Sequence, residues 1–185
     1  NVLRLAESKA WSTPIFHGEL AAFRRCLLEN LNGFPTDIGA DDSHTASRIA
    51  LMGYRAIIPE ELWVEEAVPN EGYFRWRVRR AQHLIQHFAR TLKKIRQAPK
   101  EFRVVLAIES FLHLVNPFLL LGSTILLIAS ALIVYSLTAL STLALGVVLL
   151  VIKQYRTWIV QQFNLIVASL RNLWSKEIAW SKQAK

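Results

Sequence analysis

The chain has 185 residues, a formal net charge of +8 and one cysteine, Cys26. A single cysteine excludes an intramolecular disulfide framework and is typical of a reducing compartment. Residues 1–74 carry a net charge of −5, whereas residues 75–103 carry ten Lys and Arg against Glu101 alone. Because this basic block lies directly before the most apolar part of the chain, a membrane surface or a phosphorylated substrate fits it better than nucleic acid.

The first segment predicts short extended stretches followed by a helix. The sequence does not begin with Met, and we expect a fragment whose upstream part is missing. Residues 13–25 favour two short strands about Gly18, and a glycine at such a place lets the backbone approach a ligand or a neighbouring strand closely. A helix then continues to Asn32 and stops at Gly33.

Two adjacent carboxylates, Asp41 and Asp42, lie where the next helix begins. Acidic groups at a helix N-terminus are favoured by the macrodipole and by unpaired backbone N–H groups, and this is the simpler interpretation. The alternative makes one carboxylate a general base at the mouth of an active site. At such a position the carboxylate form is stabilised, so a base there would depend on positioning as well as on its pKa.

Two more short strands are predicted at 54–58 and 62–67, each ended by a proline. Residues 71–97 then favour one long helix, with apolar residues mostly three and four apart and arginines and lysines on the other faces. A basic amphipathic helix beside a membrane is normally interfacial. We therefore expect Arg75, Arg79 and Arg90 to meet phospholipid headgroups.

From Leu114 to Ile152 there is no Asp, Glu, Lys, Arg or His for 39 residues. A membrane span needs about 20 apolar residues, so this run is long enough for two spans, at 115–134 and 138–153. The connecting loop is uncharged and the outer flanks are basic, which places both outer ends in the cytosol.

The segment that follows, 157–170, has apolar residues on one helical face and is flanked by Trp158 and Trp174. An interfacial amphipathic helix is the first interpretation, and a short third span is the alternative. The basic tail, 176–185, suits an anionic cytoplasmic leaflet.

Three sequence elements in this order resemble the C-terminal half of a membrane-bound family 2 glycosyltransferase, similar to cellulose synthase or ceramide glucosyltransferase. Residues 16–25 resemble the glycine-containing strand pair that ends in Phe-Arg-Arg. Residues 39–43, with the Gly-Tyr-Arg tail at 53–55, resemble the acidic element that supplies the base. Residues 76–82 lie where the family has its Gln/Arg-x-x-Arg-Trp element.

The resemblance implies an α/β fold: the C-terminal part of a GT-A Rossmann-like domain, followed by an interfacial helix and a transmembrane helical hairpin. It divides the chain into four parts. These are the acceptor-side part of the catalytic domain (1–72), the basic interfacial helix (73–103), two transmembrane helices (104–153), and an amphipathic helix or short third span with the basic tail (154–185).

The resemblance also implies an inverting transfer of a sugar from a nucleotide-sugar donor to a lipid or glycan acceptor. Asp42 would be the general base, and Asp41 would orient it. Arg77 and Arg80 would hold the diphosphate, because the planar guanidinium pairs phosphate oxygens bidentately. His44 and Gly18 complete the predicted substrate-binding residues, although a surface histidine is the simpler interpretation of His44.

Two features depart from the family pattern. Ala81 stands where the last element has its tryptophan, which favours single-sugar transfer over processive synthesis; Arg75-Trp76 is a rival match for the Arg-Trp pair. The sequence has no Asp-x-Asp motif. A divalent cation, Mg or Mn, is therefore expected only with a missing upstream half, without which this chain would not act alone.

We expect a multi-pass protein of the cell membrane, with the catalytic part in the cytosol and anionic phospholipids at the basic helix. The alternative hypothesis is a non-catalytic membrane anchor or assembly subunit, whose basic helix recruits lipid or a partner chain. Nucleic acid is not an expected partner, because the apolar face of the basic helix leads directly into the membrane run.

Overall fold

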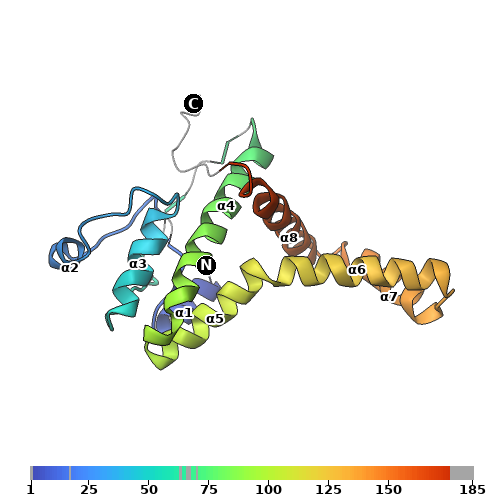
Figure 1. Cartoon of the computed structure of the whole chain (residues 1–185), viewed down its shortest axis with the longest axis horizontal. Coiled ribbons are helices and arrows are strands. Elements are labelled where there is room, and N and C mark those ends of the chain that lie inside the picture. The colour runs from blue at the N-terminus through green and yellow to red at the C-terminus, as the bar shows by residue number, and fades with distance from the viewer. Residues whose placement is uncertain (1, 17, 63, 66–67, 70, 176–185) are drawn as a thin grey trace.

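The computed structural model describes residues 2–16, 18–62, 64–65, 68–69 and 71–175, and in that part all regular structure is helical. Figure 1 shows a body formed by the helices up to α5 together with α8, and a long arm that extends from it. The elements are α1 (Val2–Ala10), α2 (Arg25–Asn30), α3 (Asp41–Leu51), α4 (Tyr73–Thr91), the 3-10 helix η1 (Leu92–Gln97), α5 (Lys100–Leu114), α6 (Asn116–Ile133), α7 (Leu137–Leu149) and α8 (Lys153–Arg171).

The predicted α/β fold is wrong for this chain, since the described residues form no β-strand. Residues 54–58, predicted as a strand, have no regular structure, and the Ala56 carbonyl accepts a hydrogen bond from the Thr13 N–H at 3.1 Å. The Ala56 N–H, however, donates to the hydroxyl of Ser12 at 2.9 Å. A sheet needs repeated backbone-to-backbone bonds, and here a side chain takes the second one.

The other two predicted strand regions, around Gly18 and at 62–67, are only partly covered by the described residues. Around Gly18 the chain turns, and residues 20–24 are irregular. The predicted strand at 62–67 includes residues 63, 66 and 67, which lie outside the described residues, as do residue 17 and the tail 176–185.

The predicted helices agree more closely. The single helix expected at 71–97 is present as α4 followed directly by η1, and the two apolar helices lie within one to four residues of the expected bounds. The amphipathic segment expected at 157–170 is part of α8. The assignment of these helices to membrane and interface remains a prediction.

Helix α4 is the centre of the body, because α3, α5 and α8 all pack against it. On one side Phe88 is fully buried against Phe102 and Leu106 of α5. On another side Val78 and Ala81 pack against Leu165 and Ala168 of α8. The helix that the sequence places on a membrane surface is thus largely enclosed by other helices.

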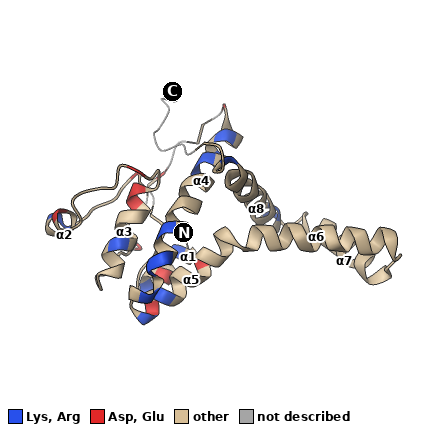
Figure 2. Cartoon of the chain, in the orientation of Figure 1, with Lys and Arg blue, Asp and Glu red and all other residues tan. Residues whose placement is uncertain are grey.

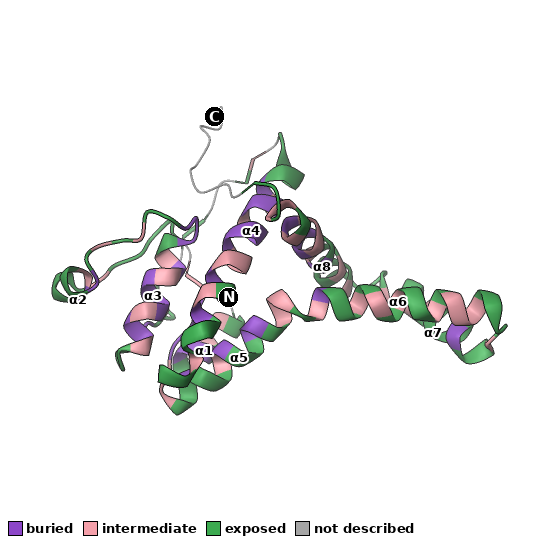
Figure 3. Cartoon of the chain, viewed as in Figure 1, coloured by how far each residue is buried: buried purple, intermediate pink, exposed green. Residues whose placement is uncertain are grey.

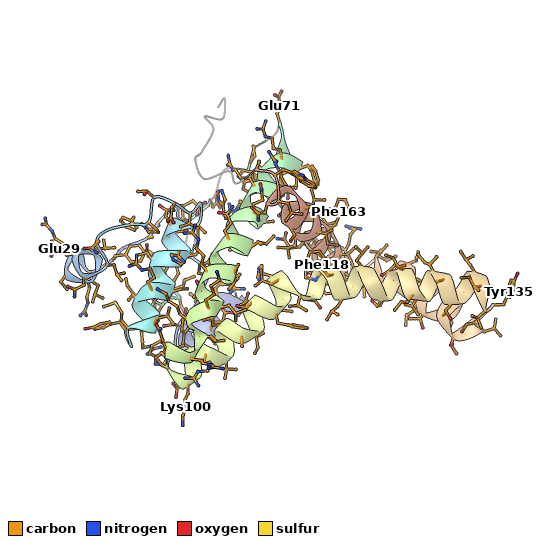
Figure 4. All side chains as sticks on the ribbon, viewed as in Figure 1. Glu29, Glu71, Lys100, Phe118, Tyr135 and Phe163 are labelled. Atoms are coloured by element: carbon orange, nitrogen blue, oxygen red, sulfur yellow. The ribbon has the colours of Figure 1, made fainter. Side chains whose placement is uncertain are left out.

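The arm is a hairpin of α6 and α7, which pack against each other. Lys, Arg, Asp and Glu gather in the body and on α8, whereas the arm carries none (Figure 2). Pro117 and Ala139 are its only buried residues within the two helices, so most of its apolar side chains are exposed (Figure 3). Tyr135, labelled in Figure 4, lies at the tip.

Among the described helices, α6 alone is long and apolar enough by itself to cross a membrane. The pair α7 and α8 meets the same criterion only when taken together, and the two helices are bent by 107° at the break between them. Ser136 begins α7, and its hydroxyl accepts a hydrogen bond from the Ala139 N–H at 3.3 Å.

A buried ion cluster ties α1 to α5. One guanidinium nitrogen of Arg4 lies 2.6 Å from Glu7 Oε2, and the other lies 2.8 Å from Glu109 Oε1. The Thr13 hydroxyl also donates to Glu7, at 2.7 Å. Burial is the main cause that raises the pKa of Glu7 to about 7. Two carboxylates therefore share one cation, and near neutral pH Glu7 holds a proton for much of the time.

Replacing the two carboxylates should have unequal effects. Glu109→Ala leaves Arg4 without this buried partner, and we expect a loss of about 3–5 kcal/mol in the free energy of unfolding. Glu7→Gln resembles the protonated form and should cost much less. Thermal unfolding of the purified full-length protein measures both, and equal losses would contradict this account of the cluster.

The pH dependence gives a second check on the same pair. A carboxyl whose pKa is higher in the folded state favours folding below its unfolded pKa, and that contribution is lost as the pH rises. The contribution of Glu7 to the free energy of unfolding should therefore fall as the pH rises from about 4.5 to about 7. Glu7→Gln should flatten the stability profile in this range.

Candidate active site

A cleft of about 670 Å³ lies between α4, the start of α3 and the irregular segment that contains Gly18. Four of the six predicted site residues line it: Gly18, Asp41, Asp42 and Arg80. The rest of its wall is mixed in character, with Ile15, Phe16, Glu19, Ala21, Phe23, Phe34, Gly39, Ala40, Ser43, Trp76, His83 and Leu84.

The carboxylate of Asp42 is held from two sides. Its Oδ1 accepts a hydrogen bond from the Ser43 N–H at 2.6 Å. On the other side the chain passes so close that a Cβ added at Gly18 would lie 3.2 Å from Asp42 Oδ2. The Ser43 hydroxyl accepts from the Phe16 N–H at 3.0 Å, which fixes the Gly18 segment to the start of α3. Gly18 thus gives the carboxylate its space.

Burial raises the pKa of Asp42 above its ordinary value. The N–H of Ser43 acts in the opposite direction, and the neighbouring carboxylate of Asp41 adds to the rise. The sequence predicted a carboxylate stabilised by the helix N-terminus; in the structure the loss of solvation outweighs that effect. Asp42 is consequently a stronger base than a carboxylate in water.

Arg80 lies across the cleft on α4. Its guanidinium is 4.9 Å from the centre of the Trp76 ring, and its Nη1 is 3.8 Å from Glu19 Oε1. The Arg80 guanidinium is therefore positioned by the Trp76 ring and by the Glu19 carboxylate. Trp76 is itself only 8% exposed.

Arg77, although predicted beside Arg80, lies on a different face of α4. Its Nη2 donates to Gln161 of α8 at 2.8 Å, and its guanidinium is 5.5 Å from the Tyr73 ring. It does not line the cleft. Ala81, the predicted match for the tryptophan of the family element, is buried against α8. The aromatic residue of this segment that faces the cleft is Trp76, which favours the rival match to Arg75-Trp76.

Two arginines expected at phospholipid headgroups take other places in the structure, one in an exposed ion pair and one buried. Arg90 binds Asp37 twice, with Nη1 2.8 Å from the carboxylate and Nη2 donating to the carbonyl at 2.8 Å. Arg79 is only 4% exposed. Arg75 is exposed, as the lipid interpretation requires.

His44 packs underneath the site and does not line the cleft. Its ring meets that of His87 edge to face at 5.7 Å, and Thr91 Oγ1 lies 3.5 Å from its Nδ1. Burial is the main cause that lowers the pKa of His44 to about 4 and that of His87 to about 3. Both rings are neutral at physiological pH, and they join α3 to α4.

Sequence reasoning missed His83, which lines the cleft, and assigned no role to Glu19. Trp76 and His83 lie four and three residues from Arg80, so helical spacing was the available signal for both. The same spacing also includes Arg77, and only the contact of Arg77 with Gln161 of α8 separates it from the cleft.

The described residues contain no group of three or more His, Cys, Asp or Glu side chains placed to hold a metal ion. Asp41 and Asp42 are two adjacent carboxylates, and Asp42 is already hydrogen-bonded to the backbone. These residues do not fit the octahedral or near-octahedral oxygen site that Mg or Mn requires.

The structure combines a helical body, an apolar helical hairpin and a cleft lined by Asp42 and Arg80. No protein-family model matches the sequence, and no curated protein does. A solved structure is similar: the mannosyltransferase PcManGT from Pyrobaculum calidifontis, in complex with GDP-Man and Mn2+. The sequence identity is 58% and the TM-score is 0.87, over 96% of this chain.

The chain spans about half the length of that mannosyltransferase, 51% of it. The likeness to a mannosyltransferase agrees with the glycosyltransferase part of the resemblance found in the sequence. The same structure contains a divalent cation and a nucleotide sugar, the two kinds of ligand that the resemblance implied.

Proposed function

We propose that this chain forms the acceptor-side and membrane-associated part of a glycosyltransferase. The observation that carries the proposal is the 58% identity to a mannosyltransferase over 96% of the chain, with the same fold. GDP-mannose is the donor we propose, because the similar enzyme is described with it. The order of the sequence elements supports a membrane enzyme like those of family 2, with a lipid or glycan as acceptor.

In the proposed reaction Asp42 takes the proton of the acceptor hydroxyl. The hydroxyl oxygen attacks the anomeric carbon, the bond from that carbon to the diphosphate breaks, and the nucleoside diphosphate leaves with its electron pair. Arg80 stabilises the charge that develops on the leaving diphosphate. Attack from the side opposite the leaving group inverts the anomeric centre.

Metal binding, and the nucleotide contacts other than that of Arg80 with the diphosphate, belong to other residues under this proposal. The described residues do not fit a divalent cation, and we assign none of the reaction steps on this chain to one. A bound cation would supply further neutralisation of the diphosphate. What this chain provides is the base, a cationic side chain and the Trp76 face of the cleft.

The surface of α8 supports a place beside lipid. Its buried positions include the polar residues Gln162 and Asn164, while Val160, Phe163 and Leu170 are 47%, 56% and 48% exposed. A helix on a water-exposed surface shows the reverse arrangement. We propose that this exposed apolar face lies in the lipid interface, with Trp158 and Trp174 near the headgroups.

Helix α5 has a similar exposed face that leads into the arm. Val104, Ile108, Phe111 and Val115 are spaced by four, three and four residues, and each is at least 44% exposed. The neighbouring η1 carries Lys93, Lys94 and Arg96 on its exposed side. Basic groups beside an apolar face suit anionic phospholipids. We therefore assign the interfacial role to α5 and α8, and α4 to the body.

Asp42→Asn should abolish mannose transfer by the full-length enzyme and leave donor binding intact. The amide keeps the shape of the carboxylate but accepts no proton, so kcat should fall by at least about 100-fold, the scale of lost general-base catalysis. Glu29→Gln, an exposed carboxylate on α2, is the matched control and should behave like wild type. Near-normal turnover of Asp42→Asn would show that Asp42 is not the base.

Arg80 and Arg77 offer a matched pair one turn apart on α4. Arg80→Ala should weaken inhibition by GDP, because its guanidinium faces the cleft. Arg77→Ala should leave GDP inhibition unchanged, since Arg77 binds Gln161. Inhibition constants for the two variants decide the assignment, and an equal effect of both would place the diphosphate elsewhere.

Single-cysteine labelling tests the membrane arrangement. The natural Cys26 is exposed and should react with an impermeant maleimide only after the cells are opened. Ser136→Cys, made in a Cys26→Ser background, should react in intact cells, because the tip of the arm would lie outside. Protection of that position until the cells are opened would show that the arm does not cross.

A further inference from the structure

Gly39, in the turn before α3, is covered by the ring of His83. A Cβ added at Gly39 would lie 2.2 Å from Cδ2, 2.3 Å from Nε2 and 2.6 Å from Cε1 of that ring. Contacts below 3.0 Å are essentially never made by real Cβ atoms. The backbone of Gly39 is not in the left-handed region. The glycine is therefore required by the space that the imidazole occupies, and not by its own conformation.

The same turn is held at a second point by α4. Arg90 binds both the carboxylate and the carbonyl of Asp37, at 2.8 Å each. Ile38, between the two contacts, is 3% exposed. Two side chains of α4 thus fix the segment immediately before Asp41 and Asp42. The contact between Arg90 and Asp37 is exposed and ionic, whereas the His83 side chain that covers Gly39 is only 5% exposed.

His83 is also linked to Arg80 through α4. The two residues are three apart on the helix, and both side chains line the cleft. The ring of His83 consequently contacts the turn that leads to Asp42, and the same helix, α4, carries Arg80 on the other side of the cleft. A shift of the ring would change how the carboxylate of Asp42 faces Arg80.

We propose that His83 is a positioning residue of the transfer reaction: its ring, resting on Gly39, sets the place of Asp42 opposite Arg80. The proposal rests on the proposed function for the roles of those two residues. Gly39 belongs to the acidic sequence element at 39–43. His83 belongs to none of the three elements, and its positioning role is the new part of the proposal. The role is steric, and the ring transfers no proton.

A double-mutant cycle in the full-length enzyme tests the contact. Gly39→Ala should push the ring away, and a misplacement near 1 Å can cost roughly 100-fold in rate, so kcat should fall on that scale. His83→Ala should reduce kcat less. In the double variant the added methyl group meets no ring, so kcat should return to the level of His83→Ala. Gly122→Ala is the matched control, because a Cβ there meets nothing within 4 Å.

Two further measurements distinguish a positioning role of His83 from a merely structural one. Donor binding, measured directly, should stay within about twofold of wild type, which corresponds to less than 0.5 kcal/mol, while kcat falls. An equal penalty of Gly39→Ala with and without His83 would overturn the proposal, and so would a normal kcat for Gly39→Ala. Failure of the proposed function would be seen separately, as full activity of Asp42→Asn.

Discussion

The burial of α4 among three other helices is the constraint on which the body depends. This helix carries five arginines, and a buried charge is costly unless it is paired. For three of them the structure meets this cost by placing the guanidinium group at the edge of a packed surface. Arg77 reaches Gln161, Arg80 reaches Glu19 and the Trp76 face, and Arg90 reaches Asp37. Each of these three arginines marks the boundary between α4 and one neighbour, so their contacts also help to fix where α8, the Gly18 segment and the turn before α3 lie.

A second consequence of this packing is the polarity of α8. Gln161 of α8 accepts from Arg77 of α4, and Gln82 and Gln86 of α4 both donate to Asn172, which directly follows α8. Leu165 and Ala168 pack against α4, whereas Val160, Phe163 and Leu170 are left outside. An amphipathic pattern in the sequence states only that two faces differ, and not which one is buried. The hydrogen bonds between α4 and α8 decide that question here, in favour of an exposed apolar face that continues toward the arm.

The sequence predicted the helices well and the strands poorly. The periodic segments became α3, α4 and α8, and the uncharged run became the arm, because helical hydrogen bonds are local and their pattern is visible within one segment. A strand needs a partner that single-sequence patterns do not specify, and Ala56 finds only one backbone bond of that kind. Within the site, the sequence found Asp42 and Arg80 but also proposed Arg77. Each residue turns a helix by about 100°, so Arg77 points about 60° away from Arg80, enough to move it from the cleft to α8.

The properties of Asp42 follow from tertiary packing that no local pattern contains. A helix N-terminus alone would favour the carboxylate and make it a weak base. The Gly18 segment, fixed by the bonds between Phe16 and Ser43, closes over the side chain and removes water, and the pKa rises instead. The N–H of Ser43 still orients Oδ1, while Oδ2 is left beside Gly18 at the cleft. One oxygen is thus held by the backbone, and the other is the one available for the proposed proton transfer. The close approach of Gly18 fits this division, because a Cβ there would lie 3.2 Å from Oδ2 and the carboxylate would have to shift by a few tenths of an ångström.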